Sequence, residues 1–175
     1  MRWTPLFLTA TLAVQAGPAA SAMTLSSADI RPNGPIAAAQ IYPRCGGQNI
    51  SPQLSWSGAP AATRSLVLTM IDLDVKPAQW SHWIVVDLPP ASNGLPRGVK
   101  SLPGRAAAVA GDFGDAAYDG PCPPAGTGVH RYQFTIWAMP AAASVIAPDA
   151  KASEIAPSLE RSALGQASLT GWVKR

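Results

Sequence analysis

The sequence lacks several features that would identify whole classes of protein. It has only two histidines, two cysteines and a charged fraction of 13%. Its cations, such as Arg31, Arg64 and Arg105, are scattered, whereas nucleic-acid binders usually carry a concentrated basic patch. No apolar run reaches the length of about 20 residues that a helix needs to cross a bilayer. The sequence therefore predicts neither a nucleic-acid partner nor a transmembrane segment.

Signatures of catalysis and of metal binding are also missing. There is no Gly-x-Ser-x-Gly elbow to present a nucleophilic serine. Ser81 precedes His82, but neighbours in a strand face opposite ways, so the two do not easily form a nucleophile–base pair. Asp72, His82 and His130 have the residue types of a metal site, yet no short-spaced pair such as His-x-x-x-His supports one. We predict no catalytic residue, no metal and no cofactor, with hydrolysis and metal binding as minor alternatives.

The first 22 residues have the pattern of a secretory signal peptide. Arg2 supplies the positive start, Leu6–Val14 the apolar centre, and Ala20-Ser21-Ala22 an A-x-A cleavage site. We expect cleavage after Ala22 and a periplasmic or secreted location. The remaining residues, 23–175, have the length of one domain with a sizeable core.

The two cysteines, Cys45 and Cys122, both follow the predicted cleavage site. In an exported chain an even pair of cysteines indicates a disulfide. Such a bond would tie the Gly- and Pro-rich turn around Cys122 to the N-terminal part of the domain. The alternative is a pair of buried free thiols.

Hydrophobic patterning predicts a mainly β fold. Near-continuous apolar runs at Ser65–Ile71 and His82–Leu88 indicate buried strands, and Arg131–Met139 alternates polar with apolar residues. Shorter strands are expected at Leu54–Trp56 and around Val99 and Val109. Strands separated by loops, with helix only late in the chain, favour an antiparallel β-sandwich.

A single helix is expected near the C-terminus. Between Ala150 and Leu169 the apolar residues Ile155, Leu159, Ala163 and Leu164 recur at helical spacing. Pro157 is expected in the first turn, where its missing N–H costs little.

Ionisable side chains gather at the ends of two predicted strands. Asp72 and Asp74 follow the first apolar strand, and two residues apart they share one face if the strand continues. His130-Arg131-Tyr132 opens the last strand, directly after the turn rich in Gly and Pro. Because binding groups usually sit on loops held by a rigid scaffold, we expect one shared site. The alternative is an ordinary hairpin with a surface histidine.

These segments resemble the motifs of the phosphatidylethanolamine-binding protein family, whose bacterial members are also called Raf kinase inhibitor-like proteins. Residues 72–77 (DLDVKP) resemble its Asp-Pro-Asp-x-Pro, and Trp80-Ser81-His82 resembles its Trp-x-His. Residues 120–132 (GPCPPAGTGVHRY) resemble its Gly-x-x-Pro-Pro-x-Gly-x-x-His-Arg-Tyr with two extra residues. Asn49–Trp56 and Gly111–Gly114 also fit, so the resemblance runs from about Arg44 to the C-terminus.

The resemblance implies a Greek-key β-sandwich with a helix near the C-terminus and a pocket for a small anionic ligand, either phosphate or a phospholipid head group. Protonated imidazoles suit such a ligand because both of their nitrogens donate hydrogen bonds. The implied ligand-binding residues are Asp72, Trp80, His82, Pro124, His130 and Tyr132. Asp74 is expected to pair with Arg131 as structural support, and Gly120 of the turn is assigned the same supporting role.

Relatives of this family also act on proteins. Some inhibit kinases or serine proteases, so a protein–protein regulator acting through the pocket face is the alternative function. A homodimer is a further expectation, because dimers are common among similar proteins.

Two residues depart from the family pattern near the expected pocket. Leu73 replaces the usual Pro and is expected to loosen the turn that sets Asp72. Asp112 stands where Asn is more usual and adds negative charge, which would disfavour a phosphate if it lies close. Trp83 is interpreted as a core residue, and Trp80, expected in a loop, as a pocket wall.

Overall fold

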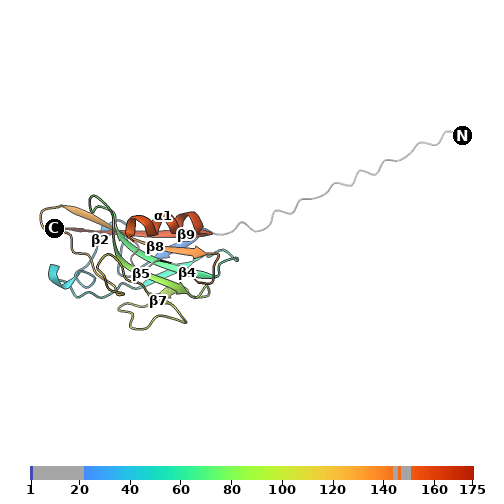
Figure 1. Ribbon diagram of the computed structural model, residues 1–175, viewed down its shortest axis with the longest axis horizontal. Helices are drawn as coiled ribbons and strands as arrows, with labels where there is room; N and C mark the ends of the chain where they lie inside the picture. The colour runs from blue at the N-terminus through green and yellow to red at the C-terminus, as the bar shows by residue number, and fades with distance from the viewer. Residues whose placement is uncertain (2–21, 144–145, 147–150) are drawn as a thin grey trace.

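The computed structural model describes residues 1, 22–143, 146 and 151–175, which form two β-sheets, one α-helix and one short 3-10 helix (Figure 1). The smaller sheet has the order β1 (Thr24–Ser26), β3 (Leu54–Ser57), β6 (Gly94–Leu95). The larger sheet has the order β2 (Gly34–Pro35), β9 (Gly165–Lys174), β8 (Val129–Met139), β4 (Ser65–Asp72), β5 (Trp80–Leu88), β7 (Ala107–Ala108). The helices are η1 (Pro43–Cys45) and α1 (Ala152–Ser162). The signal peptide predicted at the N-terminus lies outside the described residues, apart from residues 1 and 22.

The main core lies between the two sheets. Alternate residues of β8, such as Tyr132, Phe134 and Ile136, point inward and are fully buried, as the period of two in a strand requires. Leu54 and Trp56 of the smaller sheet belong to the same apolar cluster. The two sheets therefore form a sandwich closed by side chains from both.

A second apolar cluster lies on the other face of the larger sheet, beneath α1. Ile155 and Leu159 of the helix pack with Val67, Ile84 and Trp137 of the sheet. Figure 1 shows the helix lying along this outer face. None of the helices in the described part of the chain is long and apolar enough to span a membrane.

The predicted fold class is confirmed, with one difference in strand direction. β4 and β5 form an antiparallel pair, and the chain returns over a long connection to place β8 on the other side of β4. That return is the connection expected of a Greek key. The short β2 pairs with β9 in parallel, so the larger sheet is mixed rather than strictly antiparallel.

The structure corrects four details of the predicted elements. The helical segment ends at Ser162, and residues from Gly165 onward form the ten-residue strand β9. Pro157 lies inside the helix rather than in its first turn. Trp80 begins β5 and is not a loop residue. The short strand expected around Val99 instead lies at Gly94–Leu95.

Candidate functional site

Three neighbouring strands of the larger sheet bring the predicted site residues together. In the register of the sheet, Asp72 at the end of β4 is paired with Trp80 on β5 and with Tyr132 on β8. His130 precedes Tyr132 by two residues and thus lies on the same face of β8. Residues 58 positions apart in the sequence therefore meet at one end of the sandwich.

His130 is held by Asp72. Its Nδ1 atom lies 2.8 Å from Oδ2 of Asp72, and both side chains are buried. The second carboxylate oxygen, Oδ1, accepts the backbone N–H of Asp74 at 2.9 Å. With Nδ1 engaged by the carboxylate, Nε2 is the ring nitrogen of His130 left for a ligand.

His82 is fixed in the same way by a backbone oxygen. Its Nδ1 lies 2.8 Å from the carbonyl oxygen of Asp119, and the N–H of Asp119 donates to the carbonyl of His82 at 3.0 Å. Burial lowers the pKa of His82 below its usual 6.5, although the Asp119 carbonyl and the charge of Asp72 act in the opposite direction. The imidazole is therefore neutral at neutral pH and gains its proton in acid.

Tyr132 brings a hydroxyl that the described part of the chain does not satisfy. The ring of Tyr132 meets His82 edge-on with centroids 5.1 Å apart. Its hydroxyl is buried and lies near the Asp72 carboxylate without a hydrogen bond of good geometry. Burial and the nearby charge raise the pKa of this phenol, which keeps it a donor. A buried polar group without a partner is costly, so such groups usually have a ligand or water.

Phe113 belongs to the aromatic wall beside His82, and this placement was not predicted from the sequence. Phe113 lies 5.0 Å from His82, 5.8 Å from Trp80 and 5.9 Å from Tyr42, between ring centroids. Phe113 and Trp80 are 40% and 37% exposed, which is unusual for large apolar side chains. The Gly111–Gly114 motif pointed to this segment, but nothing in the spacing assigned Phe113 to the site.

The turn that precedes His130 is anchored from two directions. The N–H of Gly120 donates to Oδ1 of Asn49 at 2.7 Å, and Nδ2 of Asn49 donates to the carbonyl of Tyr118 at 3.0 Å. A Cβ at position 120 would overlap the carbonyl oxygen of Gln40, which agrees with the supporting role assigned to Gly120. The predicted disulfide between Cys45 and Cys122 is present and joins this turn to η1, with 5.5 Å between the Cα atoms.

The expected pair between Asp74 and Arg131 is also present. Nε and Nη2 of Arg131 donate to the two carboxylate oxygens at 2.9 and 2.7 Å, and the N–H of Arg131 donates to Oδ2 at 2.8 Å. These contacts lower the pKa of Asp74 to about 2. The pair joins the loop after β4 to the start of β8.

The structure places both residues that depart from the pattern. The N–H of Leu73 donates to the carbonyl of Arg131 at 2.9 Å, a bond that a Pro could not make. Leu73 therefore attaches the segment after Asp72 to β8 instead of loosening it. Asp112 accepts the N–H and the hydroxyl of Ser81, each at 2.8 Å, and the N–H of Ala152 at 3.3 Å. Its carboxylate thus binds Ser81, and its charge also acts on His82, where it opposes the lowering of the pKa.

Pro124 is the predicted ligand-binding residue with the weakest support. It is exposed at the turn, where its carbonyl accepts both the N–H and the hydroxyl of Thr127. Its neighbour Pro123 is buried. Trp83, by contrast, is buried against Tyr118 in the core as predicted.

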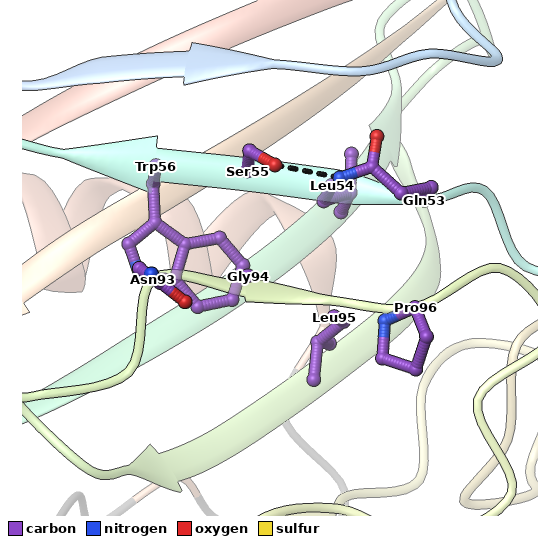
Figure 2. A pocket seen from close by; sticks show the side chains of 8 residues that line it. All are labelled: Gln53, Leu54, Ser55, Trp56, Asn93, Gly94, Leu95 and Pro96. Carbon is purple, nitrogen blue, oxygen red and sulfur yellow. Dashed lines mark hydrogen bonds between the residues drawn. The ribbon is translucent and has the colours of Figure 1, made fainter.

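Elsewhere in the described residues the structure has a shallow depression but no metal cluster. A shallow depression over β3 and β6 is lined by Gln53, Ser55 and Asn93 among others (Figure 2). Its amide Gln53 donates to Ser55 and accepts from the N–H of Ala28, so its polar groups are already paired. Within the described ranges, no three His, Cys, Asp or Glu side chains are grouped to hold a metal ion.

Comparisons with known proteins agree on one family. The description "Phosphatidylethanolamine-binding protein" applies to the family that matches residues 26–174. A UPF0098 protein of Methanothermobacter thermautotrophicus is 38% identical over 134 residues, which cover 75% of this chain and 87% of the relative. A putative lipoprotein, LppC of Mycobacterium tuberculosis, is 36% identical over 154 residues, covering 88% and 73%.

Solved structures give the same result. Escherichia coli YbcL, described as a member of the mammalian PEBP family, aligns with a TM-score of 0.81 and 28% identity over 89% of this chain and 99% of YbcL. A phosphatidylethanolamine-binding protein homologue of Chlamydia trachomatis aligns with a TM-score of 0.71 and 30% identity over 88% and 98%.

Proposed function

The chain belongs to the phosphatidylethanolamine-binding protein family, and on this premise we propose that its site binds a small phosphate-bearing ligand without converting it. The ligand is an inorganic phosphate or a phospholipid head group. Asp72, Trp80, His82, Pro124, His130 and Tyr132 are the proposed ligand-binding residues. Gly120, Asp74 and Arg131 are proposed to support these residues structurally.

The observation that carries the proposal is a pair of buried imidazoles, each of which uses Nδ1 for a hydrogen bond within the protein. His82 is engaged by the Asp119 carbonyl and His130 by the Asp72 carboxylate. The nitrogens left for a ligand are therefore the two Nε2 atoms, with the unpaired hydroxyl of Tyr132 beside them. Phosphate oxygens accept hydrogen bonds from protonated imidazoles and from a phenol. A neutral ring that donates from Nδ1 has only an acceptor at Nε2, so an anion accepts from these nitrogens when the imidazoles are protonated.

Binding without catalysis is supported by the position of the only serine next to a site histidine. The hydroxyl of Ser81 is bonded to Asp112 and not to His82. The Ser81 hydroxyl is therefore not paired with His82, as a mechanism with a nucleophilic serine would require.

We propose a periplasmic or secreted location for the mature chain. The N-terminal pattern predicts a signal peptide, and disulfides persist mainly in oxidising compartments. The bond between Cys45 and Cys122 fits such a compartment. That the relative from Mycobacterium tuberculosis carries the name lipoprotein supports the same location.

A second candidate function is regulation of a protein partner through the same face. Trp80 and Phe113 are exposed beside the imidazoles, and aromatic residues are enriched in protein interfaces. If a partner covers this wall, saturating phosphate is expected to compete with it. Partner binding that ignores phosphate would place the interaction on another surface.

Calorimetric titration tests the proposed function. Phosphate, phosphorylethanolamine and sulfate are titrated at pH 6 and pH 8 into the wild type, His130→Gln and Gln133→Ala. Gln133 lies on the opposite face of the same strand and serves as the matched control. Sulfate keeps its charge between these pH values, so its pH dependence reports the protein alone.

We expect sulfate and phosphate to bind the wild type, sulfate more tightly at pH 6, because an imidazole donates from Nε2 to the anion only when it is protonated, and the lower pH favours that form. His130→Gln is expected to weaken binding about tenfold or more, since it removes a charge-assisted bond. Gln133→Ala should bind like the wild type. Absence of binding to the wild type at both pH values would contradict the proposal.

A further inference from the structure

A polar hollow lies on the outer face of the larger sheet, beside α1. Its volume is about 330 Å³, and its walls come from β4, β8, β9, α1 and the loop between β4 and β5. The floor contains Thr69, Thr135 and Ser168, which are paired across three strands in register. We call this hollow the amide groove, after the three glutamines that line it: Gln79, Gln133 and Gln166.

The side-chain amides are the open hydrogen-bonding groups of the groove. None of the three amides is hydrogen-bonded to another described residue. The floor hydroxyls, in contrast, are already engaged, since Thr135 bonds Ser168 at 2.9 Å and Thr69 accepts Nε1 of Trp137 at 3.0 Å. Each primary amide offers two donor hydrogens and one acceptor oxygen. Three of them around one hollow can recognise a ligand that both donates and accepts.

The groove also has apolar walls. Ile71 and Leu73 border it on the side of the sheet, and Ala156 and Pro157 on the side of the helix. Pro157 lies inside the helix and has no N–H to donate. A ligand that fits therefore has apolar C–H surface as well as polar edges.

The charges of the groove exclude an anion. Glu160 is the only charged residue that lines it, and it is an acceptor. Arg131 lies on the same face of β8, two residues before Gln133, but its guanidinium is bound to Asp74. The groove thus presents no free cation to a phosphate or carboxylate.

We propose that the amide groove binds a neutral polyhydroxylated ligand with the chemistry of a pyranose sugar. Such a ring has hydroxyls that donate and accept around its edge and C–H groups on its faces, which matches the amides, the carboxylate and the apolar walls. The volume lies at the lower end of the range of small-ligand sites, about 300–1,000 Å³, which suits one ring. Gln133 and Tyr132 are neighbours on β8 and face opposite sides of the sheet, so this site is separate from the proposed anion site.

Saturation-transfer NMR on the purified protein tests the inference, with glucose, N-acetylglucosamine and myo-inositol as probes. The test variant is Gln133→Met with Gln166→Met, which keeps the side-chain length and removes two amides. Gln48→Met, at an exposed position away from the groove, is the matched control. His130→Gln reports whether a signal comes from the anion site instead.

At least one probe is expected to bind the wild type, Gln48→Met and His130→Gln with equal affinity. The double variant should bind it about tenfold more weakly, the effect of losing roughly two hydrogen bonds. The inference is overturned if no probe gives a signal, if the double variant binds unchanged, or if His130→Gln abolishes the signal. Because phosphate binding is measured separately, failure here leaves the proposed function standing.

Discussion

The side chains of Asp72 and His130 meet at 2.8 Å inside the sandwich, although 58 residues separate them in the chain. A carboxylate at Nδ1 fixes the orientation of the ring and leaves the other nitrogen for a ligand. Asp72 therefore acts on a ligand through His130. The remaining contact of Asp72, to the N–H of Asp74, holds its second oxygen in place.

Replacing Tyr132 by Phe is expected to weaken phosphate binding without lowering the stability of the fold. The hydroxyl of Tyr132 has no partner in the described part of the chain. Its removal should leave the free energy of unfolding unchanged or raise it by up to about 1 kcal/mol. Phosphate affinity should fall by roughly fivefold, because one donor to the anion is lost. Chemical denaturation and calorimetry measure the two quantities.

Tyr118→Phe is the control for that experiment. The hydroxyl of Tyr118 donates to the carbonyl of Gln40 at 3.0 Å. Its loss should lower stability by about 1 kcal/mol and leave phosphate affinity unchanged. A Tyr132→Phe variant that loses stability and keeps its affinity would reverse this assignment.

Asp119 is expected to make the stability depend on pH. Burial, together with a hydrogen bond and repulsion from Asp115, raises the pKa of Asp119 from 3.8 to about 7. The folded protein therefore holds a proton that the unfolded chain releases near pH 4. Stability from this group is present below pH 4 and is lost as the pH rises towards 7 and beyond.

Melting temperatures at pH 5 and pH 8 measure this effect. Asp119→Asn should show a smaller decrease between the two pH values than the wild type, while its backbone contacts to His82 remain. Equal pH dependence in both proteins would mean that Asp119 is ionised throughout the range.

Loss of the disulfide is expected to cost much of the stability. The bond spans 77 residues, and closing a loop of that length stabilises by about 4 kcal/mol in the chain-entropy treatment. The double variant Cys45→Ser with Cys122→Ser should lose this amount in denaturant titrations. Reductant should destabilise the wild type to the same level and leave the double variant unaffected. A wild type indifferent to reductant would show that the bond contributes nothing.

Asp112→Asn is expected to affect the helix rather than the site. The carboxylate accepts the N–H of Ala152 at the start of α1, where negative charge is favourable. The variant should lose about 1 kcal/mol of stability. Its phosphate affinity should change less than twofold, a result that a carboxylate facing the ligand would not give.

Much of the site could be predicted because its residues stand at strand ends that the sequence marks clearly. Apolar runs locate β4 and β5, and alternation locates β8, so the meeting of Asp72 with His130 and of Asp74 with Arg131 follows from the fold. Phe113 could not be assigned, because it lies in an irregular segment whose path depends on tertiary contacts. The Asp119 carbonyl was also missed, since backbone acceptors leave no trace in side-chain patterns.

The missed strand β9 has a physical reason. Ala167, Leu169 and Val173 alternate inward, but Gly165 and Gly171 interrupt the pattern and have low strand propensity. At position 171 the missing side chain serves packing, because a Cβ would meet the side chains of Ile30 and Ile36. Because the apolar residues before Gly165 recur at helical spacing, the helix was expected to continue to Leu169, over residues that belong to β9.

The disulfide also has a consequence for how the chain matures. With only two cysteines in the sequence, oxidation within one molecule has a single outcome, so no reshuffling step is needed. When the chain is made or exported from its N-terminus, Cys45 has no partner until 77 further residues have followed it. Protein produced in a reducing cytoplasm would accordingly fold without this disulfide. The turn before His130 would be covalently tethered only after the protein met an oxidant.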